Sequence, residues 1–287
     1  ILLSLFLLST TVATLSGLYG LFDGFNPLKM KPACHETRAC GLYGMYMTYG
    51  YGISLFMILV TGLLIYRERI RDLVSERWLW IVWFINLAGL YFSYARGAWL
   101  GFLMAAPFFF FKDYRRKFII AIGLSLFAFG SAFVFSDKVQ KMFLERGSSN
   151  SIRLSLYEAS FEAFKEKPVF GWGFKNFQPN VVDIKERHDI AHPNFAGHAH
   201  NNFLEHLATT GMVGFLLVIL WHLYWLKECY FREDVVGRIM FPFVISFMVS
   251  GMVQYTFGDG ENLFLVMTLW ALCQLKKPED FEQKTLL

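Results

Sequence analysis

The chain has 287 residues, of which 55% are hydrophobic, 18% aromatic and only 17% charged, and its net charge is +4 at neutral pH. A soluble domain usually carries about 25% charged residues, so this composition excludes an ordinary soluble protein. The small positive charge is not gathered in a basic, aromatic-rich module, which argues against nucleic acid as a partner. Apolar runs of about 20 residues recur, and such runs cross a bilayer core of roughly 30 Å. We therefore predict an all-α polytopic membrane protein.

Eight apolar runs predict eight transmembrane helices. They cover about 1–22, 43–66, 78–95, 97–111, 118–136, 207–226, 239–258 and 262–275. The first run could also be the core of a signal peptide, but no basic residues precede it, which favours a genuine span. Because the chain starts inside this run, we expect more spans in the full-length protein.

Basic residues predict which ends of these helices face the cytoplasm. They gather after the second, fourth, sixth and eighth spans, at 67–77, 112–117, 227–238 and 276–277. With eight spans, all four clusters lie on one side, which the positive-inside rule makes cytoplasmic. The chain then divides into spans over 1–136, a large external loop over 137–206, and spans with a short tail over 207–287.

Two external segments contain further features. Cys34 and Cys40 flank a short piece of the loop 23–42, where a disulfide and two free thiols both remain open. In the large loop, apolar residues at helical spacing predict a helix over 151–167, capped by Asn150 or Ser151 and ended by Pro168. A turn follows, in which Gly171 and Gly173 permit unusual backbone angles. Residues 179–200 are mostly polar, and we expect them to be irregular.

Two arginines are candidates for binding an anion. Arg96 lies between two apolar runs, where an arginine is costly unless it snorkels, pairs or meets an anion. The neighbouring Gly97 allows a ligand or another segment to approach closely. Arg153 lies in the first turn of the predicted loop helix, where it and the free N–H groups could share a phosphate. Snorkelling at a span end and a solvated helix surface are the respective alternatives.

His200 is the candidate general base, because imidazole titrates near neutral pH and this histidine lies where a polar segment meets an apolar run. A cap on the following helix is the alternative role. Five of the seven histidines fall within 188–206, and some of their spacings are compatible with zinc. Glu205, Asp259 and Glu261 could face the same site or be solvated. No nucleotide-binding loop, nucleophile elbow or zinc-protease helix motif is present.

The order of several motifs resembles one family. Arg-Gly-Ala-Trp-Leu-Gly begins at Arg96, Ser-Ile-Arg-Leu-Ser-Leu-Tyr at Ser151, Lys-Pro-Val-Phe-Gly-Trp-Gly-Phe-Lys-Asn-Phe at Lys167, and His-Asn-Asn-Phe-Leu-Glu at His200. Thr-Gly-Met-Val-Gly follows at 210–214. Over about 90–275 the chain resembles the O-antigen ligase and O-antigen polymerase superfamily of bacterial envelopes.

This resemblance implies a glycosyltransferase in the bacterial inner membrane with its active site on the periplasmic side. Such an enzyme takes a glycan from undecaprenyl diphosphate and, in the ligases, places it on the lipid A–core oligosaccharide, without a metal ion or other cofactor. Arg96 and Arg153 match the arginines proposed to hold the diphosphate, and His200 matches the proposed base. We further assign substrate binding to Gly171, Gly173 and Asn201.

Three alternatives to a ligase remain. The closest in chemistry is an O-antigen polymerase, which joins lipid-linked repeats to one another. A transporter would use Arg96 and His200 in a translocation path, and matched broken spans would favour it. A zinc-dependent membrane hydrolase would be built on the histidine cluster.

Overall fold

The computed structural model describes residues 2–274 except 71, 113, 136–139 and 141–146. A helix lies in each of the eight ranges predicted as spans, although the helix in the range 239–258 covers only the first part of it. These helices are α1 Leu2–Asp23, α2 Tyr46–Ile65, α3 Glu76–Ser93, α4 Arg96–Ala105 with the 3-10 helix η2 Ala106–Phe110, α5 Arg115–Phe135, α9 Asn202–Phe231, α10 Val235–Gly251 and α11 Gly260–Gln274. The described chain is thus an all-α membrane protein in class, with one two-stranded hairpin of β1 Phe25–Asn26 and β2 Lys31–Pro32.

Three of these helices are long and apolar enough to cross a membrane: α1, α2 and α9. Residues Arg96–Phe110 and Val235–Gly251 form shorter apolar helices. Large apolar side chains such as Leu217 and Leu220 of α9 are exposed, as expected of a surface that contacts lipid. That all eight helices cross the bilayer stays a prediction. The basic pair at 276–277 lies outside the described residues.

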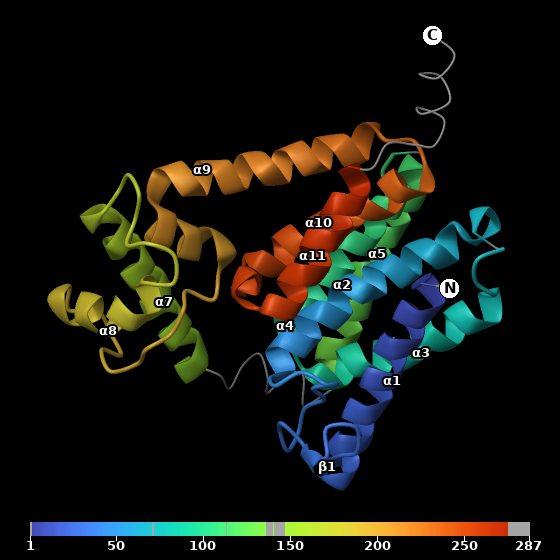
Figure 1. The fold of residues 1–287 in the computed structure, drawn as a ribbon, viewed down its shortest axis with the longest axis horizontal. Coiled ribbons are helices and arrows are strands. Elements are labelled where there is room, and N and C mark those ends of the chain that lie inside the picture. The colour runs from blue at the N-terminus through green and yellow to red at the C-terminus, as the bar shows by residue number, and fades with distance from the viewer. Residues whose placement is uncertain (1, 71, 113, 136–139, 141–146, 275–287) are drawn as a thin grey trace.

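The helical bundle packs around α2, whose side chains are mostly buried. In Figure 1 the helices α7 and α8 lie together at one side of this bundle, against the first part of α9, which then runs along the top of the view. α7 covers Gly147–Glu166 and α8 covers Phe177–Arg187. They share a small apolar core of their own with the start of α9.

Three sequence expectations were wrong at their boundaries. The loop helix begins at Gly147 rather than at Asn150 or Ser151. The range 179–200, expected to be irregular, contains most of α8, which forms because Phe177, Val181 and Ile184 recur at helical spacing and are fully buried in the core of the loop. The apolar run 239–258 is not one helix: α10 ends at Gly251, and a polar, partly 3-10 segment follows.

Candidate active site

A cavity of about 280 Å³ lies where the loop helices meet the bundle. Its volume is near the lower end of ligand pockets, which span roughly 300–1,000 Å³, so it suits a polar head group rather than a whole glycan. It is lined by Arg38, Tyr46, Met47, Tyr51, Tyr94, Ala95, Arg96, Gly97, Ile152, Arg153, Phe195 and His200. The two arginines and the histidine singled out in the sequence, Arg96, Arg153 and His200, therefore line one cavity. A third arginine, Arg38, lines it too.

Arg96 is presented by a tight turn between α3 and α4. Tyr94 ends α3 in the left-handed conformation with φ 47°, and Arg96 is the first residue of α4. Its Nη2 donates to the Asn150 side-chain oxygen at 3.4 Å. At Gly97 the close approach is made by protein, since a Cβ there would clash with the Tyr51 hydroxyl and with Val253. The turn thus holds the guanidinium at the junction of the loop and the bundle.

Arg153 reaches the same cavity from α7. Because that helix begins at Gly147, Arg153 lies in its second turn, and the expectation that it lies in the first turn was wrong. Its Nη1 donates to the backbone oxygen of Val253 at 3.4 Å. The guanidinium thus brings its hydrogen-bond donors and its charge to the cavity wall.

His200 has an uncommon backbone conformation, with φ 48°. For a residue other than glycine this costs about 1–3 kcal/mol, and strained residues of this kind cluster at active sites and ligand clamps. The backbone N–H of His200 donates to Nδ1 of His198 at 3.1 Å, and its own Nδ1 lies 2.8 Å from Oε1 of Gln254. Because an amide oxygen only accepts, Nδ1 carries the proton, and the lone pair remains on Nε2. This tautomer can act as a base.

The surroundings keep this imidazole neutral. Burial lowers the pKa of His200 below its usual value of 6.5, the charge of Arg153 lowers it further, and the hydrogen bond to Gln254 partly offsets them. Burial lowers the pKa of His198 to about 4, and the nearby imidazole of His200 and the charge of Arg153 add to the effect. Both rings are therefore uncharged at neutral pH.

The polar segment after α10 organizes this side of the cavity. Besides the contacts of Val253 and Gln254 described above, the backbone oxygen of Met252 accepts from Nδ2 of Asn201 at 2.8 Å. Oδ1 of Asn201 caps α9 by accepting from the next N–H groups, so the cap belongs to Asn201 and not to His200. Asn201, assigned above to substrate binding, uses both polar atoms within the protein and does not line the cavity.

Gly171 and Gly173 do not line the cavity. They lie in a turn whose backbone is hydrogen-bonded to α9. α9 is kinked at Gly211, where φ is 62°, and this kink frees backbone groups of the helix. The turn 168–173 replaces the lost bonds: Trp172 N donates to Ala208 O at 2.9 Å, and Met212 N donates to Pro168 O at 2.8 Å. Both turn glycines have positive φ, of 65° and 97°, as their sequence predicted.

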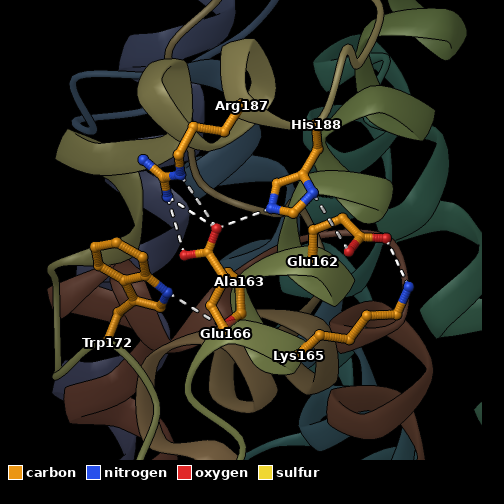
Figure 2. A network of polar contacts seen from close by, with 7 residues as sticks. All are labelled: Glu162, Ala163, Lys165, Glu166, Trp172, Arg187 and His188. Carbon is orange, nitrogen blue, oxygen red and sulfur yellow. Dashed lines mark hydrogen bonds and ion pairs between the residues drawn. The ribbon is translucent and has the colours of Figure 1, made fainter.

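The other histidines and acids are engaged elsewhere. Figure 2 shows His188 with Nε2 2.8 Å from Glu166 Oε1, beside the Arg187–Glu166 ion pair that ties α8 to α7. His192 bonds Ser151 at 3.0 Å. Within the described part of the chain, no three His, Cys, Asp or Glu side chains converge as a metal site.

The acidic candidates also lie away from the cavity wall. Glu205 is buried and accepts from Ala199 N at 2.7 Å, which supports the backbone just before His200. Asp259 accepts from Thr48 at 2.9 Å, and Glu261 is exposed. Among the described residues that line the cavity, none is acidic.

Sequence reasoning missed several residues of this site, among them Arg38, Tyr51 and Gln254. Arg38 was hidden in a loop considered only for its cysteines, and Tyr51 looked like an ordinary residue of an apolar span. Gln254 was placed inside a span, although a lone amide near the end of an apolar run is a signal that could have been used.

Comparisons with known proteins agree with the motif order. A family model described as O-antigen ligase matches residues 81–219, which include Arg96, Arg153 and His200. An uncharacterized protein of Haemophilus influenzae is 29% identical over 149 residues, an alignment that covers 45% of this chain and 37% of that relative. The chain thus matches well under half of the relative's length. Residues 81–219 of this chain are therefore similar to the O-antigen ligase family, which supports the resemblance that the motif order indicates.

Proposed function

We propose that the protein is an inner-membrane glycosyltransferase of the O-antigen ligase type. It would transfer a glycan from undecaprenyl diphosphate to the lipid A–core oligosaccharide, on the periplasmic side. The observation that carries the proposal is that Arg96, Arg153 and His200, from three separate elements, line one cavity without an acidic residue in its described lining. A cavity of this kind favours an anionic head group, and the adjoining apolar helices suit a lipid-linked substrate.

The arginines would act on the leaving group. As the bond from the anomeric carbon to the diphosphate breaks, negative charge grows on the phosphate oxygens. Guanidinium groups can meet that charge with paired, charge-assisted hydrogen bonds. Preorganized donors in a site that excludes water stabilise such a transition state most effectively. No nucleotide or metal ion is required in this reaction scheme.

His200 would act on the acceptor. Its Nε2 accepts the proton of a sugar hydroxyl, while that oxygen attacks the anomeric carbon and the diphosphate departs with the electron pair of the broken bond. Direct attack inverts the anomeric centre. A positioned base of this kind contributes about 10²–10⁴-fold to the rate.

A polymerase would use the same chemistry with a second lipid-linked repeat as the acceptor. One experiment separates the two reactions: the purified protein is incubated with lipid-linked glycan, with and without lipid A–core. Glycan that appears on lipid A–core identifies a ligase. Chains that lengthen on the lipid carrier without lipid A–core identify a polymerase, and no product of either kind would reject the proposed function.

A cell-based version checks the base. Loss of glycan from lipopolysaccharide in cells that carry His200→Ala, with normal membrane levels of the variant, is the expected result. His188→Ala is the matched control, because His188 is held by glutamates of α7 away from the cavity.

A further inference from the structure

Arg38 is a buried cation in the wall of the candidate cavity. Its side chain belongs to the loop between β2 and α2, and the residue is only 7% exposed. The guanidinium lies over the ring of Tyr46, 4.1 Å from the ring centre. Such stacking covers one face of the group and leaves the in-plane N–H donors available for hydrogen bonds. Within the described part of the chain, the guanidinium makes no ion pair, and no hydrogen bond from it is found.

The charge around the cavity is one-sided. Arg38, Arg96 and Arg153 all line it, and both other arginines lie within electrostatic range of Arg96. Like charges that share a partly buried site repel one another, and a buried cation is costly unless an opposite charge compensates it. Three guanidinium groups with no acidic side chain among the described lining residues therefore fit a ligand with more than one negative charge.

The loop that carries Arg38 is held in place on both sides of the arginine. A disulfide joins Cys34 to Cys40 and encloses Arg38 in a short ring. The next residue, Ala39, is fully buried, and its N–H donates at 2.9 Å to the backbone oxygen of Phe92, near the end of α3. The acceptor, Phe92, lies just before the turn that presents Arg96. The two arginines are thus held by the same small piece of structure.

We infer that Arg38 is a third substrate-binding arginine, which holds the diphosphate of the lipid-linked donor together with Arg96 and Arg153, and that the Cys34–Cys40 disulfide keeps it in position. The inference rests on the proposed function for the identity of the ligand. Arg38 lies outside residues 81–219, which match the family model. A diphosphate carries several negative charges, and a third guanidinium shares the charge that develops when it leaves.

The test is direct binding of undecaprenyl diphosphate without glycan to the full-length protein in detergent. We expect Arg38→Met to weaken binding by roughly 10- to 100-fold, the size expected for losing a charge-assisted hydrogen bond. Arg38→Lys keeps the charge but loses the planar fork, so its loss is smaller. Binding of undecaprenol, which has no phosphate, should not change. Lys31→Met is the matched control, since it removes the same charge from an exposed position of β2, just before the same loop.

Reduction tests the role of the disulfide. A reducing agent, or the double variant Cys34→Ser with Cys40→Ser, should weaken binding in the parent protein and add little in Arg38→Met, because residues that act through one another are not additive. Melting curves show that each variant is folded. Equal affinity of Arg38→Met and the parent, or an equal loss in Lys31→Met, would overturn the inference; unchanged affinity after reduction would overturn the role of the disulfide.

The binding assay also separates this inference from the proposed function. Binding that depends on Arg38 in a protein that transfers no glycan would leave the inference standing and reject the transferase. Glycan transfer by a protein whose affinity for the diphosphate does not depend on Arg38 would support the transferase and reject the inference.

Discussion

Replacing Gln254 with leucine should disable the base without touching the arginines. Gln254 is 2% exposed, and its Oε1 accepts the Nδ1 proton of His200 at 2.8 Å. Leucine has a similar size but offers no acceptor, so a buried donor is left unsatisfied, at a cost of about 1–3 kcal/mol. The imidazole can escape this cost by moving its proton to Nε2 or by turning. Either change removes the lone pair that takes the hydroxyl proton.

The expected loss follows from that cost. Because each ~1.4 kcal/mol is a factor of ten, the productive tautomer should fall about 5- to 150-fold, and kcat with it. The KM for the lipid-linked donor should change little, since the arginines are untouched. His200→Ala should lose more, about 10²–10⁴-fold. Gln178→Leu makes the same substitution at an exposed position of α8 and is the control.

A second substitution gives a pH signature. The base works only when neutral, so activity falls as the pH drops through the pKa of His200. Burial and Arg153 hold that pKa below 6.5, so the acid limb of the parent protein should lie below pH 6.5. Gln254→Glu places a carboxylate beside the imidazole, which favours its charged form and raises the pKa. The acid limb should therefore move to higher pH.

The assay measures initial rates of glycan transfer from purified lipid-linked donor across pH, with kcat and KM resolved for each variant. A full rate in Gln254→Leu would refute the positioning role. An acid limb that stays in place in Gln254→Glu would show that His200 is not the group that titrates.

Three further outcomes are expected. Arg153→Lys keeps the charge but loses the planar guanidinium, and it should slow glycan transfer about tenfold or more. The control Arg187→Lys, away from the cavity, should transfer glycan at the parent rate. Equal transfer rates in the two variants would reject the role of the guanidinium geometry. In a background without the unpaired cysteines, Glu186→Cys should react with an impermeant thiol reagent in intact cells and Glu233→Cys only after lysis, and the opposite pattern would invert the predicted topology. Gly211→Ala places a Cβ on a backbone with φ 62° and against Val169 of the turn 168–173, so it should cost roughly 1–3 kcal/mol or more. An unchanged melting temperature would contradict that reasoning.

Features encoded locally could be predicted. The positions of the eight apolar helices follow from runs of apolar residues, and the positive φ of Gly171 and Gly173 follows from a turn that only glycine accommodates easily. Arg96 and His200 stand out in the sequence because each interrupts or borders an apolar run, where a titratable side chain is costly without a purpose. The free-energy cost of a charged side chain at such a border can be recognised from the sequence without knowing what packs against the residue.

Boundaries were less predictable, because neighbours far along the chain decide them. The helix α8 is stabilised by burying Phe177, Val181 and Ile184 in a core shared with α7, and its polar remainder concealed that spacing. The kink at Gly211 is tolerated because the turn 168–173 supplies the missing hydrogen bonds. Neither partner can be read from the local pattern alone.

The sequence by itself therefore determined that this is a helical membrane protein and which titratable residues stand at the borders of its apolar helices. Only the tertiary structure decided that Arg38, Arg96, Arg153 and His200 line one cavity, and that Gln254 sets the tautomer of a histidine 54 residues away. The physical reason is that apolar periodicity records which face of a helix is buried, but not what it is buried against. The partner of a buried polar group depends on long-range packing, which is where the chemistry of this site is assembled.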